Sequence, residues 1–378
     1  MTSRMPVALQ QCDVFVARTM NWNYDHLRSV PRYRVVVCAE VLQNRDEFPL
    51  LETFRLDGDA LAPRIWNRIR PAVLYPPYAA RLRRYRPRVL HSHMGYVATR
   101  GMPLQAALDV PWLVSFHGAD VYLNPQLRAA RYVELFRRVS RVLALGPTMV
   151  AALTAMGCPQ EKIAIHSLGV DVGALPVRPR HRSPGDRLEI LFAGTFCERK
   201  GLPYLLDAAK LLRDRGVRFR LTVVGEVGGR PQDWAAKEAI EQRLARYDFG
   251  DCVRRLPYLR FAELIELGLS CHVLVAPSVT AADGDMEGIP VVIQQMMATA
   301  MPVVTTHHSD IPYLFGPHRQ LLLPERDATA IADRLQAYAE DPELARRHGE
   351  WFRERIVEAF DVRHCAAALA RHYDEVAG

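Results

Sequence analysis

The stretch that decides the fold runs from Val275 to Val304 and reads VAPSVTAADGDMEGIPVVIQQMMATAMPVV. An apolar run that ends at Ala276 predicts a buried strand, and a small acidic loop with two glycines follows it. Pro290 suits the first turn of a helix, where its missing N–H costs nothing. A second apolar strand is expected from Met301. Strand, glycine loop, helix and strand together predict a βαβ unit whose loop can hold an anion on free backbone N–H groups.

The rest of the chain repeats this alternation on both sides of a polar, Arg/Pro-rich segment, residues 176–187. In the first half, strands are expected at Cys12–Ala17, Tyr33–Ala39, Val89–His91, Trp112–Phe116, Val142–Leu145 and Ile163–His166. In the second half, they are expected at Leu188–Phe192, Arg220–Val224, Val253–Leu256, His272–Ala276, Pro302–Thr305 and Leu321–Leu323. Helical patterns occur at Ala129–Val139, Thr148–Met156, Leu202–Arg213, Trp234–Tyr247, Ala262–Leu269, Ala328–Ala339 and within 342–378.

This alternation of strands and helices predicts an α/β protein with two Rossmann-like, doubly wound domains that face a cleft. The expected boundaries are residues 1–175 for the first domain, 176–187 for a linker and 188–355 for the second domain. Residues 356–378 are expected to form a C-terminal helix.

The composition is typical of a globular protein that is kept in a reducing environment. Of the 378 residues, 49% are hydrophobic and 24% are charged, and no apolar run approaches the roughly 18–20 residues that span a bilayer. The N-terminus has no long apolar segment, so secretion is not expected. Seven scattered cysteines fit buried thiols better than a disulfide framework or a zinc site. These features predict a cytoplasmic protein.

Positive charge is concentrated in one segment. Between Leu61 and Leu90 the chain has eight arginines and no carboxylate, which exceeds the net charge of +7 for the whole chain. The stretch Arg64–Arg88 fits a solvated helix face, or it fits peripheral docking to an anionic membrane or to a phosphate-bearing acceptor. Nucleic acid is not expected, because no aromatic platform or recognition helix accompanies the charge.

The loop within 278–290 resembles the donor-binding loop of retaining glycosyltransferases with the GT-B fold. More narrowly, it is similar to group 1 glycosyltransferases of the bacterial exopolysaccharide, capsule and colanic-acid type. That family has two glutamates eight positions apart; Glu287 matches the first, whereas Gln295 replaces the second and Ala300 replaces a glycine. The resemblance implies a catalytic role for Glu287 and donor-sugar contacts from Asp285, Met286, Glu287 and Gly288.

A second motif, Phe192 to Gly201, resembles the family's clamp for the donor diphosphate. Lys200 matches the family lysine, whereas Thr195 replaces the family arginine and Arg199 is expected to compensate. Fixed cations beside a helix start are the counter-charge that a diphosphate requires, although an ordinary solvated Arg-Lys pair is the alternative. The resemblance implies diphosphate contacts from Gly194, Thr195, Arg199, Lys200, Gly288 and Ile289, and ribose or base contacts from Gln295, Gly225, Leu256 and Tyr258.

Histidines mark the strand ends of the first half. His117 lies in Phe-His-Gly-Ala-Asp, which matches the family's His-Gly-x-Asp motif and implies a catalytic contact near the reacting carbon. Asp120 is expected either to orient this loop or to touch a substrate. The resemblance places His91, His93, Gly95 and Asp120 on the acceptor side. It also implies that the C-terminal helix within 356–378 crosses back to the first domain.

Two patterns invite a metal assignment. His91 and His93 are spaced as metal ligands can be, and Asp283-Gly284-Asp285 resembles the Asp-x-Asp metal site of another glycosyltransferase architecture. No third ligand accompanies the two histidines, and Lys200 already supplies a cation for the diphosphate beside the Asp283 loop. We therefore expect neither a metal nor another cofactor.

The predicted function is therefore retaining transfer of a sugar by a hexosyltransferase. The donor would be a nucleotide-diphosphate sugar, and the acceptor a hydroxyl of a glycan, a lipid-linked saccharide or a glycosylated metabolite. Two alternatives remain: a GT-B epimerase or phosphorylase, and a non-catalytic module that binds phosphate or a membrane.

Overall fold

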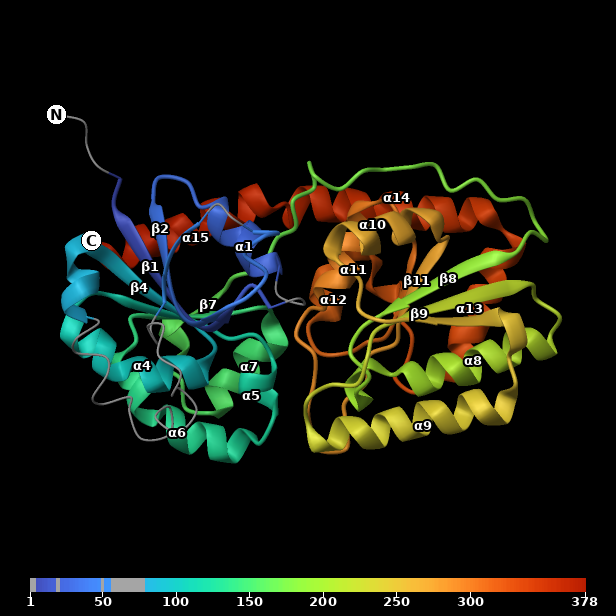
Figure 1. Cartoon of the computed structure of the whole chain (residues 1–378), viewed down its shortest axis with the longest axis horizontal. Helices are drawn as coiled ribbons and strands as arrows, with labels where there is room; N and C mark the ends of the chain where they lie inside the picture. Colours follow the sequence, from blue (N-terminus) through green and yellow to red (C-terminus); the bar gives the residue numbers. More distant parts are fainter. Residues whose placement is uncertain (1–4, 18–20, 49–50, 56–78) are drawn as a thin grey trace. The chain divides into compact units, whose positions relative to one another are not determined.

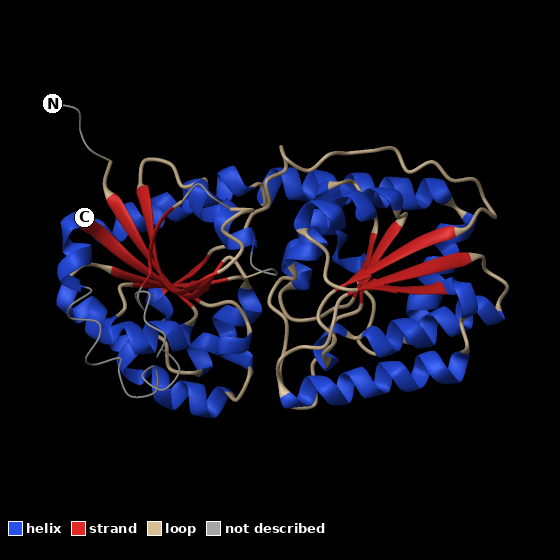
Figure 2. Cartoon of the chain, in the orientation of Figure 1, coloured by secondary structure: helices blue, strands red, loops and turns tan. Residues whose placement is uncertain are grey.

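The computed structural model describes residues 5–17, 21–48, 51–55 and 79–378. The chain divides into two compact units, of which the first contains residues 1–169 and 362–378 and the second contains residues 170–361. Each unit is a parallel sheet with helices on its faces (Figures 1 and 2).

In its described part, the first unit has seven parallel strands in the order β3-β2-β1-β4-β5-β6-β7. Their bounds are Val7–Phe15 (β1), Arg34–Leu42 (β2), Glu52–Arg55 (β3), Pro87–His93 (β4), Trp112–Ser115 (β5), Arg141–Ala144 (β6) and Ile163–Ile165 (β7). Residues on both faces of the central strands are buried, as is typical of a parallel sheet covered by helices. The order reverses beside β1, which pairs with both β2 and β4.

Helices of the first unit come from both ends of the chain. Among the described residues, the α-helices are Asn21–Arg28 (α1), Gly95–Leu108 (α4), Ala119–Tyr122 (α5), Pro125–Arg138 (α6), Pro147–Ala155 (α7) and Val362–Ala377 (α15). The C-terminal helix α15 packs against α1 and β4. Its Leu369 and Tyr373 are buried in one hydrophobic core with Ala8 and Val37 of the sheet. The last helix in the sequence is thus part of the first unit.

The second unit contains five parallel strands in the order β10-β9-β8-β11-β12. They are Leu188–Ala193 (β8), Phe219–Val224 (β9), Val253–Leu256 (β10), Val273–Ala276 (β11) and Val303–Thr305 (β12). Its α-helices are Leu202–Asp214 (α8), Pro231–Tyr247 (α9), Phe261–Ser270 (α10), Val291–Ala298 (α11), Ile311–Phe315 (α12), Ala328–Glu340 (α13) and Pro342–Ala359 (α14). Because β8 pairs with β9 on one side and with β11 on the other, the topological switch point lies between β8 and β11.

The predicted α/β fold with two doubly wound sheets is confirmed. The strand expected at Leu321–Leu323 is wrong, because Leu321 ends a 3₁₀ helix and Leu323 makes one isolated bridge to Thr306. Strand β3 was not predicted. Residues 176–187 form neither helix nor strand and belong to the second unit.

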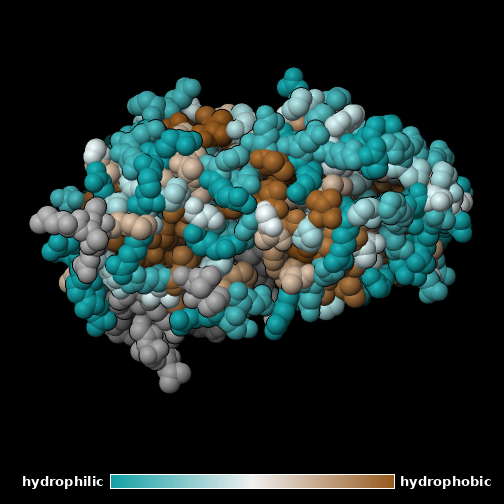
Figure 3. Space-filling model, turned by 90° about the horizontal axis from the view of Figure 1, so that it is seen from above, coloured by the Kyte–Doolittle hydropathy of each residue, from teal (hydrophilic) through white to brown (hydrophobic). Residues whose placement is uncertain are grey.

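The surface seen in Figure 3 is largely hydrophilic, with hydrophobic side chains in separate patches. Within the described part of the chain, no helix is both long and apolar enough to span a membrane. The arginine-rich segment is partly outside the description, which excludes Arg64, Arg68 and Arg70. Its remaining arginines, at positions 81, 83, 84, 86 and 88, are exposed.

Candidate functional site

Two loops meet at the switch point of the second unit. One follows β8 and contains the predicted clamp, and the other follows β11 and contains Glu287. Gly201 lies where they touch: its φ is +67°, and a Cβ atom there would lie 1.8 Å from the carbonyl oxygen of Pro277. Val279 donates its N–H to the carbonyl of Arg199 at 2.9 Å. A side chain at position 201 would therefore separate the two loops.

The predicted clamp and the predicted donor-sugar residues are joined by ion pairs. Arg199 donates from Nε to Glu287 Oε1 at 2.6 Å and from Nη1 to Asp285 Oδ2 at 2.7 Å. Lys200 Nζ lies 3.0 Å from the other oxygen of Glu287. Burial alone would raise the pKa of Glu287, but these two cations outweigh it and lower that pKa to about 2. Glu287 is thus a carboxylate at neutral pH and holds both cations in place.

A third cation, Arg230, joins this cluster and was not predicted from the sequence. It lies just before α9 and donates from Nη1 to Asp285 Oδ2 at 2.6 Å. Its Nη2 donates to Asp233 Oδ1 at 3.0 Å. Asp285 Oδ1 has no hydrogen-bond partner among the described residues. The Gly228-Gly229-Arg230 sequence after β9 was a possible signal, but its ion pair crosses 55 positions and no local pattern indicates it.

The buried side chain of His308 holds the loop that contains Glu287 through hydrogen bonds. The N–H of Glu287 donates to His308 Nε2 at 3.0 Å, so this ring carries its proton on Nδ1, which lies 2.5 Å from Glu325 Oε1. Glu325 also accepts the N–H of Thr280 at 2.8 Å. His308 and Glu325 thus tie the start and the end of this loop to the segment that follows β12, and the sequence did not reveal either residue.

The other predicted diphosphate and donor-sugar residues lie in the same two loops. Thr195 Oγ1 is 2.8 Å from the hydroxyl of Tyr258. Lys200 packs its side chain beside Gly194, where a Cβ would lie 3.4 Å from Lys200 Cδ. Ile289 is buried in a hydrophobic core, so its side chain is not available to a ligand. Gly288 is buried and Met286 is partly buried.

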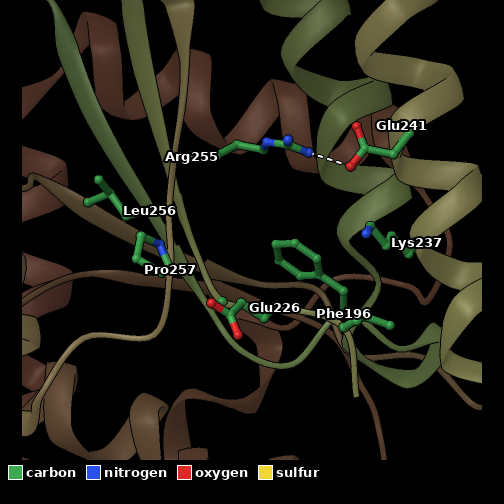
Figure 4. Close-up of a pocket in the computed structure, with 9 residues that line it drawn as sticks. Phe196, Glu226, Lys237, Glu241, Arg255, Leu256 and Pro257 are labelled. Carbon is green, nitrogen blue, oxygen red and sulfur yellow. Dashed lines mark hydrogen bonds and ion pairs between the residues drawn. The ribbon is translucent and has the colours of Figure 1, made fainter. Parts of the chain in front are cut away.

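A pocket of about 450 Å³ lies beside these loops, at the carboxyl ends of β9 and β10 (Figure 4). It is lined by Phe196, Gly225, Glu226, Val227, Lys237, Glu241, Arg255, Leu256 and Pro257. Two predicted ribose or base residues, Gly225 and Leu256, line it and are joined by a hydrogen bond of 3.1 Å between the N–H of Gly225 and the carbonyl of Leu256. Gln295 does not line this pocket; it is buried on α11.

In the first unit, His117 follows β5 as predicted. Its ring centroid lies 4.8 Å from that of Trp22 and 5.8 Å from that of His93, and the two imidazoles are nearly parallel. Neither ring nitrogen of His117 has a hydrogen-bond partner among the described residues. Burial lowers the pKa of His117 to about 4, against a smaller opposing effect of Asp120. His117 is therefore neutral at pH 7 and has unused hydrogen-bonding capacity.

Asp120 fixes the main chain around His117. Its Oδ1 accepts the N–H groups of His117 and Gly118, both at 3.0 Å, and its Oδ2 accepts the N–H of Gly95 at 2.9 Å. The geometry therefore favours the first of the two expectations, orientation of the loop. Gly95 lies so close to Phe116 that a Cβ would be 2.3 Å from its ring, so this glycine serves packing.

The two histidines that end β4 belong to a buried hydrogen-bond network. His91 contacts the hydroxyl of Tyr373 through Nδ1 and that of Ser115 through Nε2, both at 2.8 Å. His93 Nε2 lies 3.1 Å from Gln10 Oε1, and Gln10 donates to Tyr373 at 3.0 Å. Burial lowers the pKa of both histidines well below its ordinary value. Within the described residues there is no group of three or more side chains that could hold a metal.

Two doubly wound parallel sheets, with a cation-bearing loop at the switch point of the second, define the class of GT-B glycosyltransferase folds. The crystal structure of Anabaena Alr3699/HepE in complex with UDP and glucose has this fold, with a TM-score of 0.79 at 15% identity over 98% of this chain and 100% of that chain. Sucrose-phosphate synthase from Thermosynechococcus elongatus gives a TM-score of 0.78 at 20% identity over 98% of this chain and 99% of that chain.

Sequence comparison matches each half of the chain to a family of glycosyltransferases. Residues 176–355 match the family "Glycosyl transferases group 1", and residues 26–173 match "Glycosyltransferase Family 4". The second half of the chain thus matches the group 1 glycosyltransferases, and the first half matches glycosyltransferase family 4.

Two of the curated relatives are named for colanic acid and amylovoran biosynthesis. The putative colanic acid biosynthesis glycosyltransferase WcaL of Escherichia coli is 37% identical over 228 residues, which are 60% of this chain and 54% of that protein. The amylovoran biosynthesis glycosyltransferase AmsK of Erwinia amylovora is 32% identical over 248 residues, 64% of this chain and 58% of that protein. The chain thus spans about half the length of the curated relatives it matches.

Proposed function

We propose that this protein is a retaining hexosyltransferase that moves a sugar from a nucleotide-diphosphate donor to a hydroxyl of a saccharide or lipid-linked acceptor. The observation that carries the proposal is the cluster of Arg199, Lys200 and Glu287 at the switch point of a unit from the group 1 family. Relatives named for colanic acid and amylovoran biosynthesis, and a structural neighbour crystallised with UDP-glucose, support it.

The geometry suggests how the groups would share the reaction. As the bond between the sugar and the diphosphate breaks, negative charge grows on the leaving phosphate, and Lys200 and Arg199 would stabilise it. Glu287 would accept hydrogen bonds from donor-sugar hydroxyls while it holds both cations. The leaving phosphate itself would take the acceptor proton on the same face. His117, which is neutral, would contact the sugar near its reacting carbon without adding charge.

A panel of nucleotide sugars tests the proposal. Donors that bind should raise the melting temperature, because a ligand that binds only the folded state stabilises it by RT ln(1 + [L]/Kd). Transfer to an added saccharide or lipid-linked acceptor, with retention at the anomeric carbon, should follow. Epimerised or phosphorolysed sugar without transfer would favour the epimerase or phosphorylase alternative, and binding without turnover would favour a non-catalytic module. The named relatives favour neither alternative.

We also propose that catalysis needs no metal and no other cofactor. Asp285 already has two guanidinium groups on one oxygen, so its charge is compensated without a divalent ion. Activity should therefore survive EDTA. Loss of activity with EDTA and its recovery with manganese would instead make Asp283 and Asp285 metal ligands.

A cytoplasmic location with peripheral contact to the inner membrane face is part of the proposal. The exposed arginines Arg81, Arg83, Arg84, Arg86 and Arg88 support it, because each basic residue near an anionic surface contributes about 1 kcal/mol. The protein should float with anionic vesicles at low salt and not with neutral ones. Equal behaviour with both would leave the arginines as a solvated surface.

A further inference from the structure

The clamp of this chain lacks one cation at a defined place. Where the group 1 pattern has an arginine, Thr195 has an uncharged hydroxyl, and this hydroxyl lies 2.8 Å from that of Tyr258. An arginine can give a phosphate two parallel hydrogen bonds and a positive charge, whereas a hydroxyl can give one hydrogen bond and no charge. A diphosphate next to Thr195 would therefore be held more weakly unless another cation reaches it.

The loop after β9 lies directly against Thr195. A Cβ on Gly228 would lie 3.0 Å from Thr195 Cγ2, and a Cβ on Gly225 would lie 2.0 Å from the carbonyl oxygen of Gly194. Phe196 donates its N–H to the carbonyl of Glu226 at 2.7 Å. Arg230 comes two residues after Gly228, so its side chain starts next to the place of the missing arginine.

Arg230 can leave its ion pair with Asp285 without leaving that carboxylate unpaired. Arg230 and Arg199 both donate to Oδ2 of Asp285, at 2.6 and 2.7 Å, whereas Oδ1 has no partner among the described residues. Asp285 would keep a guanidinium if Arg230 moved, because Arg199 is also fixed by Glu287. The side chain of Arg230 is 29% exposed, against 21% for Arg199 and 18% for Lys200.

The charges of the cluster balance before any ligand arrives. Three cations, Arg199, Lys200 and Arg230, face three carboxylates, Asp233, Asp285 and Glu287. Because each cation is already paired, one of them must leave its carboxylate partner before it can bind a phosphate of the ligand. The greater exposure of Arg230 and the shared oxygen of Asp285 make it the best placed of the three.

We propose that Arg230 is a third diphosphate-binding cation of this protein, beside Lys200 and Arg199, and takes the role that Thr195 cannot fill. It leaves Asp285 and pairs with the diphosphate of the nucleotide sugar, while Arg199 keeps its bonds to Asp285 and Glu287 and compensates their charge from beside the phosphate. This inference rests on the proposed function, since it assigns a residue to the donor of that reaction.

The competing explanation is that Arg230 only caps α9. Its main-chain N–H donates to Asp233 Oδ2 and its Nη2 to Asp233 Oδ1, both at 3.0 Å. Arg230→Gln keeps the main-chain bond and a polar side chain but removes the charge. A role in capping alone would lower stability and leave ligand affinity unchanged.

The test is calorimetric titration with UDP, GDP and ADP, followed by the free nucleoside of whichever diphosphate the wild type binds. Arg230→Gln should weaken diphosphate binding about tenfold or more and leave the nucleoside unchanged, because the lost bonds are charged ones to phosphate. Arg230→Lys should lie between the two. Arg246→Gln, at the far end of α9, is the matched control and should bind like the wild type.

Restoration at a second position is the sharper test. If Arg230 replaces the missing arginine, Thr195→Arg in the Arg230→Gln background should recover most of the diphosphate affinity. Unchanged diphosphate affinity in Arg230→Gln, or an equal loss for the nucleoside, would overturn the inference and leave the proposed function intact. A wild type that binds none of the three diphosphates would overturn both.

Discussion

Each unit has a cluster of polar side chains at the carboxyl ends of its parallel strands. The side chains of one cluster are uncharged, and those of the other are charged. In the first unit, His93 and His117 lie at the ends of β4 and β5 and stack on each other. In the second unit, Lys200, Arg199 and Glu287 follow β8 and β11 and form ion pairs. One cluster is neutral at pH 7 and the other is fully charged.

The difference shows that neighbouring charges determine whether a buried side chain is neutral or charged at pH 7. Burial lowers the pKa of His117 to about 4, because the opposing effect of Asp120 is smaller than the cost of desolvation. Burial would raise the pKa of Glu287, yet two cations in contact lower it to about 2. The first unit thus offers uncharged hydrogen-bonding groups suited to sugar hydroxyls, and the second offers charge suited to phosphate.

The largest expected effect concerns the neutral cluster. His117→Ala should lower kcat by a factor on the order of 10²–10³, the cost of losing one transition-state contact. Its melting temperature should change little, because both ring nitrogens lack partners among the described residues. His91→Ala is the contrasting variant: both its ring nitrogens are bonded, so it should lose stability. Near-normal turnover in His117→Ala would remove this residue from the reaction.

The charged cluster around Glu287 should make the free energy of unfolding depend on pH. The folded-state pKa of Glu287 is about 2 and its ordinary value is 4.5, so its stabilisation is complete above pH 4.5 and is lost as the pH falls towards 2. Glu287→Gln should therefore lower the free energy of unfolding by about 3 kcal/mol at pH 7. The difference from the wild type should narrow between pH 4.5 and 2.

Urea denaturation at pH 7, 5 and 3 measures this difference. Glu266→Gln is the control, since its pair with Arg178 is exposed and should contribute less than about 1 kcal/mol at any pH. A Glu287→Gln difference that stays constant from pH 7 to 3 would contradict the depressed pKa.

How far the sequence predicts this fold depends on where polar residues are buried. Strand β1 was expected at Cys12–Ala17 but spans Val7–Phe15, because Gln10 and Gln11 are fully buried within it. Both glutamines make hydrogen bonds that bury them without penalty, to Tyr373 and to Ser92 respectively. A polarity pattern cannot anticipate partners that lie 363 and 81 positions away.

The same limit applies to the candidate site. Lys200, Glu287 and His117 could be found because each lies in a short motif whose strand, turn and helix are local. Arg230, His308 and Glu325 could not, because their roles come from loops that meet only after the sheet has formed. The strand expected at Leu321–Leu323 failed for a related reason: apolar residues suffice for a bridge, but a strand needs a neighbouring ladder.

The smallest expected effect is at Gln295, which replaces the second glutamate of the family pattern. A glutamate there can accept hydrogen bonds from both ribose hydroxyls, whereas the amide accepts one and donates one. A bond to a charged acceptor contributes about 1.5–3 kcal/mol against roughly 1 kcal/mol for a neutral one. Gln295→Glu should therefore lower the donor KM about fivefold and leave kcat nearly unchanged, as expected for ground-state binding.

Initial-rate kinetics with varied donor concentration give both constants. Gln294→Glu is the matched control, because Gln294 is the preceding residue on α11 and is only 1% exposed. That variant buries a new carboxylate away from the predicted ribose, so it should lose stability without a lower donor KM. An unchanged donor KM in Gln295→Glu would mean that residue 295 does not touch the ribose, because a charged acceptor at a true ribose contact cannot leave donor binding unaffected.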